Sequence, residues 1–172
     1  KSFVDLNELV EQTADLIRQS LQGADIELSM DLDPQLPPVW ADEDLIKQVL
    51  MNMLVNAQHA IENDGRISVR TRLCEADPRQ AAPELAGPMA EISICDTGCG
   101  IPEEDLQKIF DPFFTTKGVG RGTGLGLSVS HGTIEAHGGS IEVDSTVGEG
   151  SEFRIYLPLN GASADTDEQH DD

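Results

Sequence analysis

Apolar side chains recur along this chain with two different periods, and each period predicts one kind of element. Spacings of three and four residues predict helices at residues 2–21, 42–62 and 125–137, and a short helix that begins with a proline is predicted at residues 102–109. Alternation of apolar with polar residues predicts strands at residues 26–32, 67–73, 90–95, 140–145 and 152–157. The pattern therefore predicts an α/β two-layer sandwich: a mixed sheet of about five strands with three main helices on one face.

The segments between these elements separate a folded part from a tail. Three prolines among residues 34–38 interrupt the chain before the long helix. Residues 75–88 hold three prolines and four alanines without a period, so we expect a loop or an insertion there. Residues 110–123 are rich in glycine and aromatic residues and also predict a loop. Residues 161–172 carry five acidic residues and no Lys or Arg, which predicts an acidic disordered tail after one domain at residues 1–160.

The charge of the chain excludes two classes of partner. Its 172 residues include 11 Lys and Arg against 32 Asp and Glu, a net charge of −21. We therefore expect no nucleic acid as a partner and no direct membrane contact, because both surfaces are anionic. Cys74, Cys95 and Cys99 form no C-x-x-C pair, which favours free cysteines in a reducing compartment.

The long helix predicted at residues 42–62 has a polar stripe next to its apolar face. Spacings of four, four and three residues put four polar side chains on one side of it: Gln48, Asn52, Asn56 and His59. The apolar residues that should meet the sheet are Leu50, Met53, Leu54, Ala57 and Ile61. The stripe is either a solvated edge or a site where carboxamide oxygens ligate a hard cation such as Mg²⁺.

An aspartate and two glycines follow directly after the predicted strand at residues 90–95. Asp96 at the end of a strand can simply form a turn. Alternatively, its carboxylate can accept a hydrogen bond from an exocyclic amine at the floor of a pocket. Gly98 and Gly100 would then let the backbone approach a flat ring closely.

The densest glycine segment is residues 118–126, with the sequence GVGRGTGLG, directly before the predicted helix at residues 125–137. Such a loop can surround phosphates with backbone N–H groups while the helix N-terminus faces their charge. Lys117 and Arg121 add two cations in an otherwise acidic chain, which favours an anionic ligand. The alternative is a surface loop without a ligand.

Together these motifs resemble the catalytic and ATP-binding domain of bacterial sensor histidine kinases, within the superfamily that also contains gyrase, heat-shock chaperone and mismatch-repair ATPases. The resemblance spans residues 3–159. In the family's order, NMLVNA at residues 52–57 resembles the N box, DTGCGIP at 96–102 the first glycine box, FDPFF at 110–114 the F box, GTGLGL at 122–127 the second glycine box and GEGSEF at 148–153 the third.

The resemblance implies a Bergerat-type ATP-binding fold, with ATP and Mg²⁺ as ligands. It implies that Asp96 binds the adenine amino group, that Asn56 coordinates Mg²⁺, and that Asn52 and His59 lie near the phosphates. It further assigns nucleotide binding to the turn residues Gly98, Gly100 and Ile101, to the lid residues Lys117, Arg121, Gly122, Thr123, Gly124, Leu125 and Gly126, and to Ser151, which would help Asp96 to hold a water. Phe110, Phe113 and Phe114 are expected to anchor the lid.

The activity implied by the resemblance is transfer of the γ-phosphoryl group of ATP to a histidine. None of the four histidines suits that role, so we expect the acceptor on a separate dimerisation domain of a longer kinase, which in turn serves a response regulator. We expect a cytoplasmic, monomeric domain, whether or not the parent kinase is anchored in a membrane. The alternatives are an ATPase of the gyrase or chaperone type and a nucleotide-switched binding module. Against the ATPase, Asn52 stands where gyrase-type relatives have a glutamate.

Overall fold

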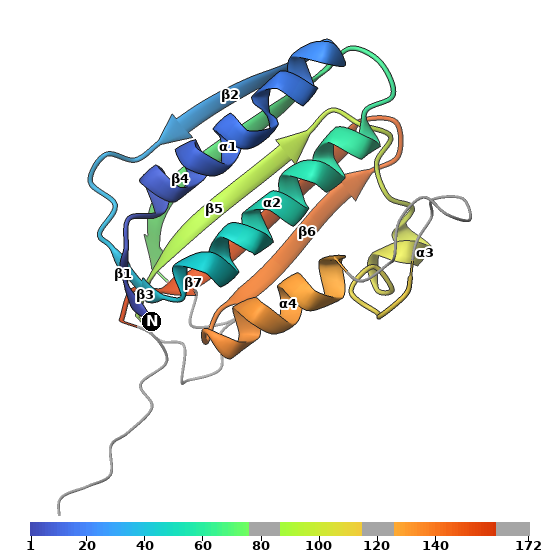
Figure 1. Cartoon of the computed structure of the whole chain (residues 1–172). Coiled ribbons are helices and arrows are strands. Elements are labelled where there is room, and N and C mark those ends of the chain that lie inside the picture. Colours follow the sequence, from blue (N-terminus) through green and yellow to red (C-terminus); the bar gives the residue numbers. More distant parts are fainter. Residues whose placement is uncertain (76–86, 115–125, 161–172) are drawn as a thin grey trace, which may run out of the picture.

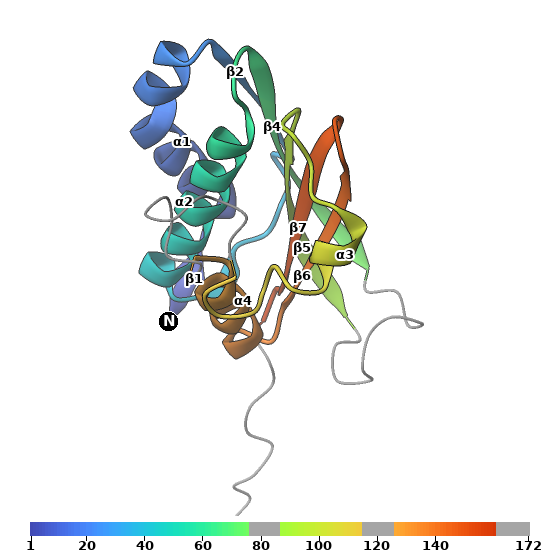
Figure 2. The ribbon, with the colours of Figure 1, turned by 90° about the vertical axis from the view of Figure 1, so that its right-hand side faces the viewer.

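The computed structural model describes residues 1–75, 87–114 and 126–160 and has two layers (Figure 1). The sheet order is β2 (Ile26–Leu32), β4 (Gly65–Glu75), β5 (Pro88–Asp96), β7 (Gly150–Pro158) and β6 (Ser140–Thr146). β2 is parallel to β4, and the other neighbours are antiparallel. The helices α1 (Leu6–Gly23), α2 (Glu43–Ala60) and α4 (Gly126–Ala136) cover one face of the sheet (Figure 2). This confirms the predicted mixed sheet in a two-layer α/β sandwich.

The core lies between the helices and the sheet, where the predicted apolar positions meet. Asp5 and Asp42 cap the two long helices, accepting hydrogen bonds from the backbone N–H groups of Glu8 and Leu45 at 3.2 Å each. The buried residues of α2 are Ile46, Val49, Leu50, Met53, Leu54 and Ala57. They pack against apolar side chains of β4, β5 and β7 that alternate as predicted. In the described parts of the chain, no helix is long and apolar enough to cross a membrane.

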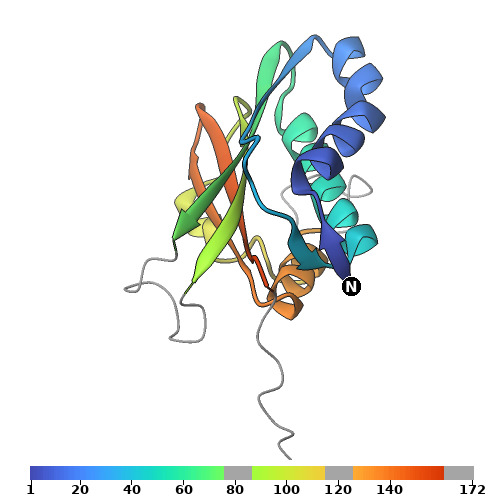
Figure 3. The same ribbon diagram turned by 90° about the vertical axis from the view of Figure 1, so that its left-hand side faces the viewer.

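The helix predicted at residues 2–21 begins later than expected. Residues 2–4 instead form β1 (Ser2–Val4), which pairs antiparallel with β3 (Val39–Ala41), a short strand that the sequence pattern did not predict (Figure 3). Phe3, which fits the helical spacing, is 64% exposed and lies edge-on against Trp40, with ring centroids 5.0 Å apart. The physical reason is Asp5, because the residues before a helix N-cap are not helical.

The other boundaries shift by a few residues. The short helix α3 (Glu103–Leu106) covers only part of the predicted residues 102–109. β4 continues to Glu75 and β5 already begins at Pro88, so the loop predicted at residues 75–88 is shorter at both ends. Most of that loop and the acidic tail lie outside the described residues, at 76–86 and 161–172, so these two expectations remain predictions.

A buried histidine connects α4 to the start of α2. His137 is 3% exposed, and its Nε2 accepts a hydrogen bond from the backbone N–H of Asp42 at 3.1 Å. Its Nδ1 lies 2.7 Å from the carbonyl oxygen of Thr133 and therefore donates to it. These two bonds specify a neutral ring with its proton on Nδ1. His137 thus has a structural role, in agreement with its exclusion as a phosphoacceptor.

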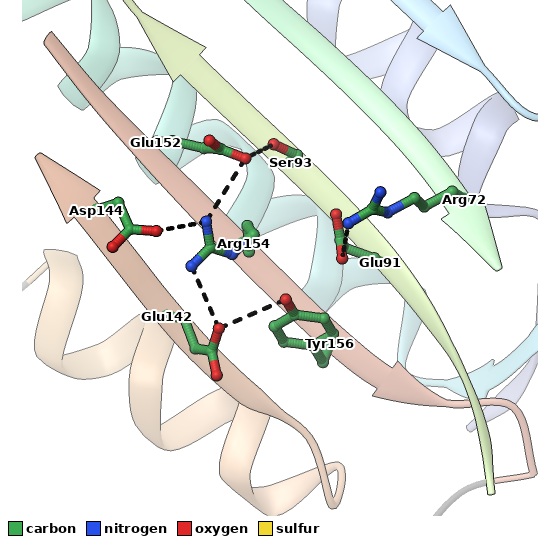
Figure 4. Close-up of polar contacts among 8 residues, drawn as sticks. All are labelled: Arg72, Glu91, Ser93, Glu142, Asp144, Glu152, Arg154 and Tyr156. Atoms are coloured by element: carbon green, nitrogen blue, oxygen red, sulfur yellow. Dashed lines mark hydrogen bonds and ion pairs between the residues drawn. The ribbon is translucent and has the colours of Figure 1, made fainter. Parts of the chain in front are cut away.

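The sheet face away from the helices carries ion pairs between neighbouring strands (Figure 4). Arg154 on β7 contacts Asp144 at 2.6 Å and Glu142 at 3.3 Å, both on β6. Arg72 on β4 contacts Glu91 on β5 at 3.0 Å. The Glu91 side chain is only 3% exposed, whereas that of Arg72 is 54% exposed. The arginine therefore compensates a carboxylate that is almost fully removed from water.

Replacing Arg72 by alanine is expected to lower the free energy of unfolding by about 1–3 kcal/mol, because Glu91 would become a buried charge without its cationic partner. Arg70→Ala is the matched control: Arg70 lies on the same strand and face, but its partner Asp31 is 83% exposed. We expect that control to cost at most about 1 kcal/mol. Urea denaturation measures both variants, and equal losses would contradict the assignment.

Candidate nucleotide-binding site

Asp96 is the last residue of β5 and is almost completely buried, at 4% exposed. Its Oδ1 accepts a hydrogen bond from the backbone N–H of Gly98 at 2.8 Å. Burial raises the pKa of the Asp96 carboxyl above its ordinary value, and hydrogen bonds from the backbone amides of Gly98 and Ser151 oppose this shift. The structure therefore holds a carboxylate in a fixed orientation at the floor of the predicted site.

The turn after Asp96 packs backbone to backbone against the β6–β7 turn. Gly100 has φ +74°, and a Cβ atom there would lie 2.2 Å from the carbonyl oxygen of Thr146. Gly150 has φ +124°, and a Cβ atom there would lie 1.9 Å from the carbonyl oxygen of Asp96 itself. Both distances are far below van der Waals contact, so the two backbones can approach only because these residues are glycines.

Hydrogen bonds join the same turn to two other elements. The N–H of Cys99 donates to the carbonyl oxygen of Ala60, the last residue of α2, at 2.9 Å. The carbonyl oxygen of Cys99 accepts from the N–H of Gly148 at 2.8 Å. A Cβ atom on Gly98 would lie 2.5 Å from the same Ala60 oxygen. The turn is thus held between the end of α2 and the β6–β7 turn, beside Asp96.

The polar stripe of α2 lies toward α4. The Asn52 side chain donates from Nδ2 to the hydroxyl of Ser130 at 3.3 Å and to the carbonyl oxygen of Gly126 at 3.5 Å. Asn56 follows one turn later, is half-buried, and has no side-chain hydrogen bond to any other described residue. Gln48 and His59 are exposed at the two ends of the stripe. Asn52 therefore fixes the start of α4, while the carboxamide of Asn56 remains available to a ligand.

Several expected site residues lie outside the described residues. These are Lys117, Arg121, Gly122, Thr123, Gly124 and Leu125, so their roles remain predictions. Of the expected lid anchors, Phe110 and Phe114 pack against the core. Phe113 does not, because it is 73% exposed. The lid itself lies outside the described residues, so the anchoring role expected of Phe113 remains a prediction.

Sequence reasoning missed Ser145, which contacts this site through its hydroxyl. The Ser145 Oγ accepts the N–H of Ile101 at 2.7 Å and lies 2.7 Å from the Oγ of Ser151. A signal for it exists in the sequence. Along β6 every second residue faces the helices, and these residues are Ile141, Val143 and Ser145. A serine thus occupies a position where the alternation predicts an apolar residue.

The described residues fit an adenine nucleotide with Mg²⁺. A buried carboxylate can accept a hydrogen bond from an exocyclic amine, and the glycines beside it allow the backbone packing that holds it in place. On the neighbouring helix α2, the Asn56 carboxamide offers an oxygen of the type that Mg²⁺ prefers. The two groups belong to neighbouring elements, α2 and β5, that pack directly against each other.

Comparison with known families supports the same interpretation. Residues 41–161 match the family model described as histidine kinase-, DNA gyrase B- and HSP90-like ATPase. The chain belongs to this family. A solved structure described as the catalytic domain of histidine kinase ThkA narrows the assignment from this broad family to the histidine kinases. It is 32% identical in sequence, superposes with a TM-score of 0.76, and the match covers 93% of this chain and 97% of that one. This chain is thus a histidine kinase catalytic domain that binds ATP.

Curated relatives of this histidine kinase domain are sensor kinases of much greater length. The sensor histidine kinase ZraS of Klebsiella oxytoca is 41% identical over 94% of this chain and 32% of its own length. The histidine-protein kinase AtoS of Escherichia coli is 45% identical over 91% of this chain and 24% of its own. The chain therefore spans a third or less of these two relatives.

We expect Gly150→Ala to lower both stability and nucleotide affinity, because the added methyl group would collide with the backbone of Asp96 at a φ that L-residues rarely adopt. The cost in unfolding free energy should be about 1–3 kcal/mol. Gly132→Ala in α4 is the control, since nothing lies within 4 Å of its Cβ position. That control should be neutral or stabilising by up to about 1 kcal/mol. Thermal unfolding and ADP titration test both variants, and an unaffected Gly150→Ala would contradict the close packing.

Proposed function

We propose that this domain binds Mg·ATP and donates the γ-phosphoryl group to a histidine on a separate dimerisation domain of its parent kinase. The observation that carries the proposal is the buried Asp96 carboxylate held at the end of β5 by a glycine turn. Family membership supports it, because two relatives that match more than 90% of this chain are sensor kinases.

At the adenine end, Asp96 accepts a hydrogen bond from the exocyclic amine of the base. Guanine presents a carbonyl oxygen at the equivalent position, which a carboxylate repels. Gly98, Gly100 and Ile101 shape the turn beside the ring, and Ser151 helps to hold a water next to Asp96. Asp96 thus makes the site selective for adenine nucleotides.

At the phosphate end, Asn56 is the proposed ligand of Mg²⁺. Bound Mg²⁺ neutralises part of the negative charge of the triphosphate during transfer. Lys117, Arg121 and the backbone N–H groups of residues 122–126 bind the phosphates, and His59 lies near them. Asn52 supports this region through its hydrogen bonds to the first turn of α4.

Asn52 also favours phosphoryl transfer to histidine over hydrolysis by water. Gyrase-type relatives have a glutamate one turn before the metal asparagine, where it resembles a general base. A carboxamide has no useful basicity near neutral pH, so Asn52 cannot accept a proton from water. General-base assistance contributes typically about 10²–10⁴-fold to a rate, so bound ATP should be nearly inert toward water.

The proposal implies two partners. The first is the histidine-bearing dimerisation domain, which receives the phosphoryl group directly. The second is a response regulator, which receives it from that histidine. One similar solved structure is of histidine kinase ThkA in complex with response regulator protein TrrA; it is 29% identical, with a TM-score of 0.72, and this chain covers 42% of it.

We place the domain in the cytoplasm, where ATP is available, and we expect it to be monomeric by itself.

Mixing the chain with radiolabelled Mg·ATP tests the proposal. We expect slow hydrolysis and no labelling of the chain itself, because no suitable acceptor histidine is present. Labelling should occur when a histidine-bearing dimerisation domain from the parent kinase is added, and its label should be acid-labile. Rapid steady-state hydrolysis by the chain alone, abolished in Asn56→Ala, would overturn the kinase function in favour of an ATPase.

We expect Asn56→Ala to weaken Mg·ATP binding while leaving metal-free ATP binding little changed, because only the metal loses a ligand. The control variant is Gln58→Ala, which removes a carboxamide from the same helix that is hydrogen-bonded to Ser20 at 2.7 Å. Calorimetric titrations with Mg²⁺ and with EDTA measure both variants. An equal loss under both conditions would contradict the ligand role of Asn56.

A further inference from the structure

Ser145 joins the three backbone segments that surround Asp96. Its hydroxyl lies 2.7 Å from the N–H of Ile101, in the turn after β5. It lies 3.0 Å from the carbonyl oxygen of Gly150 and 2.7 Å from the hydroxyl of Ser151, both at the start of β7. Ser145 itself lies near the end of β6, five residues before Gly150.

The three contacts use the complete hydrogen-bonding capacity of one hydroxyl. A serine hydroxyl has one proton to donate and two lone pairs to accept with. Ser145 accepts the N–H of Ile101 and donates its proton to the oxygen of Gly150. The remaining contact must then be a donation from Ser151 to Ser145. This arrangement uses the only proton of the Ser151 hydroxyl, which leaves that oxygen free to accept a hydrogen bond from a water.

The segments that Ser145 joins also supply the groups that orient Asp96. The backbone amide of Gly98 donates to the Asp96 carboxylate at 2.8 Å, and Ser151 is the residue of β7 that pairs with Asp96. Gly98 belongs to the turn that Ser145 binds at Ile101, and Ser151 contacts Ser145 directly. Loss of the Ser145 hydroxyl would therefore release both sides of the Asp96 site, while Asp96 itself is unchanged.

We propose that Ser145 is a positioning residue for the adenine site, which fixes the orientation of Asp96 and Ser151 without contacting the nucleotide. The proposal rests on the proposed role of Asp96 in binding adenine. It assigns to a β6 side chain part of the discrimination between adenine and guanine nucleotides.

Titration of the full 172-residue chain with ADP and with GDP tests this role. Ser145→Ala should weaken ADP binding by about three- to tenfold, the factor that corresponds to about one neutral hydrogen bond. GDP binding should change little, so the ratio of ADP to GDP affinity should fall by the same factor. The ratio of affinities measured with and without Mg²⁺ should stay constant, since the metal end of the site is not affected.

Two further serine variants provide the controls. Ser145→Thr keeps the hydroxyl on a strand that tolerates β-branched residues and should restore the selectivity. Ser140→Ala removes a hydroxyl from the other end of the same strand and should leave it unchanged. If Ser145→Ala weakens ADP and GDP binding equally, or only in proportion to the unfolded fraction measured by denaturation, the role is purely structural and the proposal fails.

Asp96→Asn separates failure of this proposal from failure of the proposed function. If Asp96→Asn leaves the selectivity of ADP over GDP intact, the adenine role of Asp96 is wrong, and the inference for Ser145 fails with it. If Asp96→Asn abolishes the selectivity for ADP over GDP but Ser145→Ala keeps the selectivity of the unchanged chain, only the positioning role of Ser145 is overturned. A reduced ratio in both variants, with rescue by Ser145→Thr, supports the proposal.

Discussion

The site depends on direct packing between two backbone turns. The turn after Asp96 and the turn between β6 and β7 approach so closely that a Cβ atom at Gly100 or Gly150 would lie 2.2 or 1.9 Å from a carbonyl oxygen. This contact brings together residues about 50 positions apart and places the end of α2 beside them through Ala60. Because backbone packs directly on backbone at this contact, Asp96 is buried although it is the last residue of its strand.

α2 connects this carboxylate to the rest of the domain through its two faces. Its apolar face packs on the sheet, while its polar face and its N-cap hold the two ends of α4. Asn52 binds the first turn of α4 at Gly126, and the backbone of Asp42 binds His137 just after the last turn. The start of α4 is therefore fixed relative to Asn56, at the phosphate end of the proposed site.

Electrostatics explains why the proposed site depends on local groups. A chain with a net charge of −21 repels a nucleotide at long range. The described arginines do not relieve this repulsion, because Arg72 and Arg154 are paired with carboxylates on the open face of the sheet. Salt screens distant charges beyond about 8–10 Å. Under the proposed function, binding of the anion would then depend on Mg²⁺ held by Asn56 and on the cationic side chains of Lys117 and Arg121.

The sequence alone determined the main helices, the strands of the five-stranded sheet and the motifs, because each depends on local spacing: the apolar face of α2, the alternation of β4 and β7, and Asp96 followed by glycines. It could not predict β1 and β3, which are three residues each and exist only because they pair with one another. It could not determine whether Asn52 faces solvent or α4, nor that Ser145 binds Ile101 and Ser151. These facts depend on which distant segments meet, and only the tertiary packing of glycine backbones and of α4 against α2 decides that.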